Sequence, residues 1–155
     1  MYKRIVVPLD GSELAESALN HVKKITEGRK IDKLVILRIV EPLIVDVKDY
    51  IGAERVKEAE EKMIDEAKNY LKSIEKKLKE EGYNVKSIVE ISADPAAKIL
   101  EVAKEEDADL IVMSTHGRTG FRRWIFGSVA HKVLAHSNIA VLIAVPEGEK
   151  SDVRW

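Results

Sequence analysis

Five short apolar runs rich in β-branched residues recur along the chain, and between them lie segments of helical character. Apolar residues in these segments recur three and four positions apart, as in Leu14, Ala18, Val22 and Ile25. Regular alternation of strand and helix implies right-handed crossovers and parallel strands. The predicted fold is therefore α/β, an open five-stranded parallel sheet with helices on both faces. The predicted strands are Arg4–Leu9, Lys33–Val40, Val85–Ile91, Leu110–Met113 and Ala140–Val145.

The longest predicted helix runs from about Ala53 to Glu81 and is followed by Gly82, a residue that commonly ends helices. A coiled-coil partner is an alternative use of its apolar stripe, but covering the sheet is the usual one. At 155 residues the chain matches one domain, 1–155, in which 147–155 is expected to form a loose tail. The predicted apolar stripe is Val56, Ala59, Met63, Ala67, Leu71, Ile74 and Leu78.

The charge and hydropathy of the chain argue against nucleic acid and membranes as its partners. The chain has 26 Lys and Arg against 27 Asp and Glu, so no overall field attracts nucleic acid or an anionic membrane. It contains no cysteine and no apolar stretch of membrane-spanning length. We therefore expect a cytoplasmic protein with neither nucleic acid nor membrane as a partner.

The stretch from Ser114 to Ser128 directly follows an apolar strand and contains three glycines, Gly117, Gly120 and Gly127. Glycines let backbone amides approach a ligand, and the helix that begins near Ser128 presents unpaired N–H groups and a positive dipole end. Both features suit a phosphate group. Two readings stay open on these residues alone: a phosphate cradle, or glycines that only turn the chain before a helix capped by Ser128. The spacing excludes a Walker A loop and a Gly-x-Gly-x-x-Gly motif after the first strand.

Several segments of the chain resemble the universal stress protein family. They are Ile5–Ser12, Leu37–Val40, Asp94–Ala96, Val112–Gly117, Gly127–Val129 and Val141–Ile143. Nucleotide-binding members of the family carry a glycine motif, which falls here on Ser114, Gly117, Gly127 and Ser128. Ser114 departs from it, since the fullest form of the motif has glycine there.

The resemblance implies a Rossmann-like sheet of the adenine nucleotide alpha hydrolase type, in strand order 3-2-1-4-5. It further implies that the chain binds ATP, or AMP or ADP, with Mg²⁺ or Mn²⁺ held through the phosphates. The first strand would contact the adenosine, the second would add apolar contact, and the glycine loop would hold the phosphates. The candidate binding residues are Pro8, Leu9, Asp10, Ile39, Val40, Met113, Ser114, His116, Gly117, Arg118, Gly120, Gly127, Ser128 and Val129.

In that order the third and fifth strands form the edges of the sheet. Lys86 and Glu90 discourage pairing at the third strand, whereas Ala140–Val145 is uncharged. We therefore expect a homodimer that pairs through Ala140–Val145, as the resemblance also implies.

Two candidate residues have structural alternatives. Asp10 and Glu13 have the spacing of a capping box, with Asp10 as the N-cap. His116 either lines the phosphate site or only fixes the turn. The sequence shows no catalytic constellation. The function that the resemblance implies is a nucleotide-dependent stress-response or signalling dimer. The alternatives are a slow ATP hydrolase, in which His116 or Asp10 would orient water, and a dimeric scaffold that needs no nucleotide.

Overall fold

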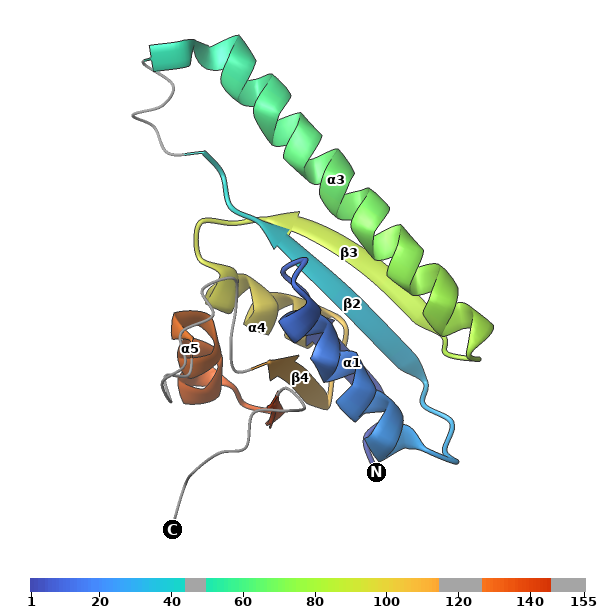
Figure 1. Ribbon diagram of the computed structural model, residues 1–155. Helices are drawn as coiled ribbons and strands as arrows, with labels where there is room; N and C mark the ends of the chain where they lie inside the picture. Colours follow the sequence, from blue (N-terminus) through green and yellow to red (C-terminus); the bar gives the residue numbers. More distant parts are fainter. Residues whose placement is uncertain (44–49, 115–126, 146–155) are drawn as a thin grey trace.

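The computed structural model describes residues 1–43, 50–114 and 127–145 of the chain. These residues form a five-stranded parallel sheet in the order β3-β2-β1-β4-β5 (Figure 1). This confirms the predicted α/β class and the 3-2-1-4-5 order, and the strand bounds differ from the predicted ones by at most one residue. The strands are β1 (Arg4–Pro8), β2 (Lys33–Val40), β3 (Val85–Ile91), β4 (Leu110–Ser114) and β5 (Ala140–Ala144).

The helices lie on both faces of the sheet (Figure 1). One face packs against α1 (Glu13–Thr26) and α3 (Ala53–Glu80), and we call it the α1/α3 face. The other packs against α4 (Pro95–Glu105) and α5 (Ser128–His136), and we call it the α4/α5 face. Because both faces are covered, successive strand residues are apolar without polar alternation, as the central strands of parallel sheets usually are.

Helix α3 covers the sheet for only part of its length. Ala59 and Met63 are half-buried, because the first turns of α3 extend beyond the end of β3 (Figure 1). The sheet-covering use of the stripe is therefore confirmed for its C-terminal part. The stripe residues that are buried are Val56, Ala67, Leu71, Ile74 and Leu78.

Helix α3 ends at Glu80, two residues before Gly82, as predicted from that glycine. Gly82 has a φ of 92°, its N–H bonds to the carbonyl of Lys79, and the N–H of Tyr83 bonds to the carbonyl of Leu78. These two bonds form a Schellman motif, which satisfies the last carbonyls of the helix and needs a left-handed residue.

None of the helices in the described part of the chain combines the length and the apolar character needed to span a bilayer.

Candidate functional site at the carboxyl ends of β1 and β4

The strand order places a topological switch point between β1 and β4. The two strands are parallel neighbours, with Ile5 opposite Leu110 and Val6 opposite Ile111. Helix α1 follows β1 on the α1/α3 face, while α5 lies on the α4/α5 face. In open α/β sheets, ligands bind outside the carboxyl ends of the strands at such a point.

The segment after β1 turns sharply at this edge. The N–H of Leu9 donates to the Leu37 carbonyl at 2.7 Å, so Leu9 prolongs the pairing with β2 beyond Pro8. The Leu9 side chain is 2% exposed and belongs to the core of the α1/α3 face. Leu9 therefore offers its backbone to the site and not its side chain.

Asp10 holds the turn, but it is not the N-cap of α1. Its Oδ1 accepts hydrogen bonds from the backbone N–H of Ser12 at 2.9 Å and from the Ser12 hydroxyl at 2.5 Å. Ser12 is the N-cap, and its Oγ accepts from the N–H of Ala15 at 3.1 Å. The predicted capping box of Asp10 and Glu13 is thus wrong, because Gly11, at a φ of 88°, turns the chain so that Ser12 reaches the helix start.

The other oxygen of Asp10 is free to accept. Oδ2 makes no hydrogen bond with any residue that the structure describes. A carboxylate oxygen is an acceptor only, so it suits a hydroxyl or an amine of a ligand. Asp10 therefore combines a structural role through Oδ1 with an open acceptor position.

The apolar candidates separate onto different faces. Ile39, Met113 and Val129 all belong to the core of the α4/α5 face, where Ile39 and Val129 are half-buried. Val40 is 3% exposed, and strand alternation turns its side chain toward the α1/α3 face. Ile39 and Met113 therefore form the apolar ends of β2 and β4 on the α4/α5 face, and Val40 does not join them.

Ser114 occupies the last position of β4, opposite Ala144 of β5. Among the described residues that are not glycine, Asp107 is the one with a positive φ, so serine is accommodated at position 114 without backbone strain. Its Oγ is buried and has no hydrogen-bond partner among the described residues. The departure from glycine thus leaves an unpaired hydroxyl at the strand end.

Helix α5 begins without a side-chain cap from the part of the chain that the structure describes. Gly127 is its N-cap, with a φ of −52° and a ψ of 152°. Ser128 is the first helical residue and is exposed, so the reading of Ser128 as its own cap is wrong. Uncapped N–H groups and the positive end of the helix dipole favour an anion here.

Four of the candidate residues, His116, Gly117, Arg118 and Gly120, lie outside the described residues. The others that the structure describes lie at the ends of β1, β2 and β4 or at the start of α5, on the same edge of the sheet.

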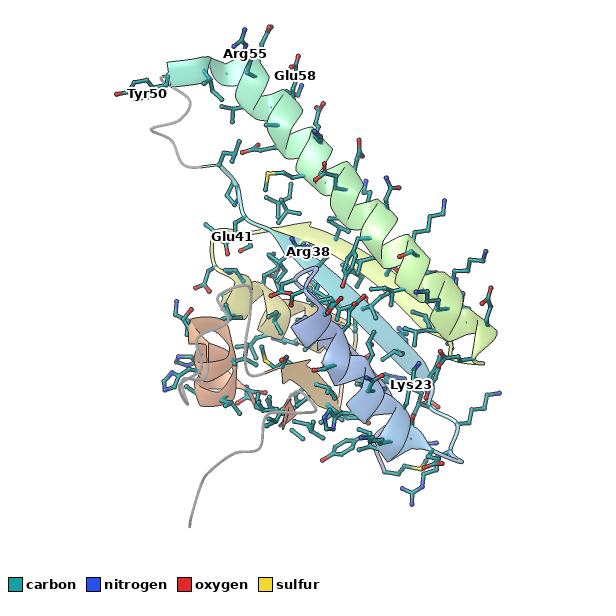
Figure 2. All side chains as sticks on the ribbon, in the orientation of Figure 1. Lys23, Arg38, Glu41, Tyr50, Arg55 and Glu58 are labelled. Carbon is teal, nitrogen blue, oxygen red and sulfur yellow. The ribbon has the colours of Figure 1, made fainter. Side chains whose placement is uncertain are left out.

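Sequence reasoning missed a group of charged and polar residues on the α1/α3 face beside Asp10. The hydroxyl of Tyr70, on α3, is buried beside the carboxylate of Glu16 of α1. Burial first, and then the nearby carboxylates of Glu16 and Asp10, raise the pKa of the Tyr70 phenol, and Arg38 of β2 opposes them (Figure 2). These residues are far apart in the sequence, and no motif joins them.

The described residues form no metal-binding site of their own. Within ranges 1–43, 50–114 and 127–145, no group of three or more His, Cys, Asp or Glu side chains could hold a metal.

Comparison with known proteins identifies the family. Residues 1–145 match the model of the universal stress protein family. The chain is 32% identical over 155 residues to universal stress protein MJ0577 of Methanocaldococcus jannaschii, covering 92% of this chain and 94% of that one. It is 30% identical over 151 residues to universal stress protein YxiE of Bacillus subtilis, covering 92% of this chain and 99% of YxiE.

Solved structures show the same fold. The structure of MJ0577 superposes with a TM-score of 0.82, covering 96% of this chain and 99% of that one. A universal stress protein of Archaeoglobus fulgidus, solved in complex with dAMP, is 23% identical with a TM-score of 0.60, covering 92% and 97%. A universal stress protein solved in complex with cAMP is 22% identical with a TM-score of 0.55, covering 93% of this chain and 97% of that one. The family match over residues 1–145 and these relatives together show that the chain belongs to the universal stress protein family.

Proposed function

We propose that this chain binds an adenine nucleotide, ATP first among them, at the carboxyl ends of β1 and β4. The observation that carries the proposal is the uncapped start of α5, whose N–H groups lie at the topological switch point beside the end of β4. The complexes of two family members with dAMP and cAMP support it, because both ligands are adenine nucleotides.

Different described residues would bind different parts of the nucleotide. Phosphate oxygens would accept from the backbone N–H groups at Ser128 and Val129, and from the Ser128 hydroxyl. Ile39 and Met113 would contact the base, and Asp10 Oδ2 would accept from an adenosine N–H or O–H group. Since the described residues supply no metal-binding cluster, Mg²⁺ or Mn²⁺ would take its ligands from the phosphates, and we assign no step to it.

The function that follows is a protein whose partners or assembly depend on bound nucleotide, in a stress-response or signalling role. It needs no chemistry at the phosphates. Slow hydrolysis would require a water-orienting residue, for which Asp10 and His116 are the candidates, and a scaffold would require no nucleotide at all.

The first test identifies what the purified protein carries. The protein is denatured, and released nucleotides are identified by mass spectrometry. Calorimetric titration with ATP, ADP and AMP then ranks them. At ligand concentrations of about one hundred to one thousand times Kd, binding raises the free energy of unfolding by about 3 to 4 kcal/mol. If no nucleotide is released and titration produces no heat, nucleotide binding is excluded and the dimeric scaffold is the remaining function.

The second test places the phosphates. The φ of −52° at Gly127 is open to any residue, so Gly127→Val keeps the backbone and fills the space before α5. We expect loss of nucleotide binding with an unchanged circular dichroism spectrum. Ala97→Val, which enlarges an exposed residue in the first turn of α4, is the matched control and retains binding. If the Gly127 variant binds ATP normally, the phosphates lie elsewhere.

A further inference from the structure

A second surface, away from the carboxyl edge, lies where α3 passes over the edge strand β3. A groove of about 820 Å³ runs between them. Buried Leu71 and half-buried Val89 form its apolar floor, and half-buried Ser87 lines it beside them. Four lysines of α3 line it at helical spacing, so they lie along one side of the helix: Lys68, Lys72, Lys76 and Lys79.

The lysines of this groove are in excess over its acids. Glu75 and Glu80 are the two acidic residues that line it. Glu75 is engaged, since it accepts hydrogen bonds from Lys79 and from the Ser87 hydroxyl, which together lower the pKa of its carboxyl. The other three lysines are exposed and form no ion pair with any residue in the described ranges. The groove therefore presents uncompensated positive charge beside an apolar floor.

The same groove contains the free backbone of the edge strand. The Asn84 carbonyl accepts from Leu34 at 2.8 Å, and the Ser92 N–H donates to Val40 at 3.1 Å. In a parallel pair, alternate residues turn their backbone groups to the neighbouring strand, so even-numbered residues face β2. The N–H and C=O groups of Ser87 and Val89 consequently point outward, away from the sheet.

One of the two charges that the sequence places on β3, that of Lys86, is paired away from the groove. Lys86 donates to Glu106 at 2.5 Å, and Lys33 donates to the same carboxylate at 3.1 Å. Glu106 comes from the end of α4, so Lys86 is neutralised on the opposite face of the sheet from the groove. On the groove side, the β3 residues are the uncharged Ser87 and Val89.

We propose that this groove accepts an extended acidic segment of another protein, which adds to β3 as a strand. Its backbone would pair with Ser87 and Val89, while its acidic side chains would lie beside the lysine row of α3. A second copy of the chain fits poorly. Antiparallel two-fold pairing of β3 with β3 would place both α3 helices on one face and bring two lysine rows together.

The experiment uses a fluorescent peptide of alternating glutamate and threonine, and a second peptide with lysine in place of glutamate. Anisotropy with the full-length protein should show saturable binding of the glutamate peptide that weakens as salt rises, and none of the lysine peptide. Equal binding of both peptides, or no binding of either at low salt, overturns the proposal.

A pair of charge-reversed variants localises the surface. Lys68→Glu, Lys72→Glu and Lys76→Glu together should weaken binding by at least about tenfold. Lys57→Glu, Lys62→Glu and Lys77→Glu change the charge of the same helix equally outside the groove and should weaken it less than about twofold. Equal effects of the two sets contradict the proposal. Should the groove variant not fold, Lys72→Glu against Lys77→Glu decides the same question.

Backbone pairing has its own readout. On adding the glutamate peptide to the unaltered protein, amide hydrogen exchange should slow at Ser87 and Val89. Exchange at Lys86 and Ile88 should not change, because these residues already face β2. Unchanged exchange at Ser87 and Val89 means that no strand is added. If a single-stranded oligonucleotide slows exchange at Ser87 and Val89 equally, the groove is a general polyanion surface. If the mass of the protein doubles without peptide, β3 pairs with a second copy of the chain. Either result overturns the proposal.

Discussion

Two side chains at the carboxyl edge, Asp10 and Ser114, differ in their hydrogen bonding. Asp10 Oδ1 accepts two hydrogen bonds from Ser12, whereas the buried Oγ of Ser114 has no partner among the described residues. A buried hydroxyl without a partner has lost its water without replacement, which costs free energy. At the level of single residues, the edge therefore has one well-held group and one that is unsatisfied.

Ser114→Ala removes the unsatisfied hydroxyl and keeps the strand. We expect the free energy of unfolding of the nucleotide-free protein to rise by about 1 kcal/mol, because no hydrogen bond is lost and a desolvated polar group disappears. Urea unfolding measures the change. A loss of about the same size would mean that the hydroxyl has a partner in the folded protein.

Glu106 is the residue at which pH should act most clearly on stability. Its side chain is 10% exposed. The hydrogen bond from Lys86, assisted by that from Lys33 and opposed by burial, lowers the pKa of Glu106 below its ordinary value of 4.5. The stabilisation is present above the ordinary pKa and is lost as pH falls through the lowered one.

Glu106→Gln should lower the free energy of unfolding by about 1 to 3 kcal/mol at neutral pH, because charge-assisted hydrogen bonds are lost. The difference from the unaltered protein should shrink as pH falls below 4.5, where the unaltered glutamate also becomes neutral. Urea titrations across this pH range give the measurement. A difference that stays constant down to the lowered pKa would exclude the ion pairs as its source.

At the scale of elements, each helix is placed by how it begins and ends. Helix α1 starts at Ser12 through the turn held by Asp10, α3 ends in the Schellman motif at Gly82, and α5 starts uncapped after Gly127. Two of these termini are satisfied within the chain. The third has no side-chain cap among the described residues, as is also true of the start of α3 at Gly52. Binding is assigned to α5 because its start follows β4 at the switch point.

Gly82→Ala tests the end of α3. Its φ of 92° strains any residue with a Cβ, so we expect a loss of about 1 to 2 kcal/mol in urea unfolding. Asn69→Ala, at an exposed position inside the same helix, should instead stabilise by about 0.5 kcal/mol. If both changes act alike, helix propensity and not the left-handed cap determines the stability of this end.

At the scale of the whole molecule, the two edges of the sheet have different characters. Strand β3 carries Lys86 and Glu90 and borders the lysine-lined groove, whereas β5 is uncharged and half-buried from Ala140 to Ile143. An uncharged edge pairs readily with a second copy of itself. Self-association is thus expected at β5, and an acidic partner at β3.

Ile143→Lys tests the dimer that we propose at β5. Paired by a two-fold axis, two copies would bring the new charges together, so the dimer dissociation constant should rise by at least about tenfold. Ile88→Lys is the matched control, since Ile88 is also half-buried on an edge strand and packs on the α4/α5 face. Sedimentation equilibrium gives the masses, and a monomer at every concentration of the unaltered protein would disprove this dimer.

The local sequence pattern was sufficient to predict the α/β fold class and the edge of the sheet at which the candidate site lies. Runs of β-branched residues and helical spacing are short-range properties, and so are the glycine that ends α3 and the glycines before α5. The strand order and the individual binding residues came from resemblance to the family. The order is confirmed, and those residues that the structure describes lie at one edge.

Only the tertiary structure determined which side chains from distant parts of the sequence contact one another. It brought Tyr70 of α3 beside Glu16 of α1, and it brought Glu106 beside Lys33 and Lys86. It also set the lysine row of α3 beside the free backbone of β3. Such pairings join residues distant in the sequence and depend on the register and face of each element, which only the packed sheet determines.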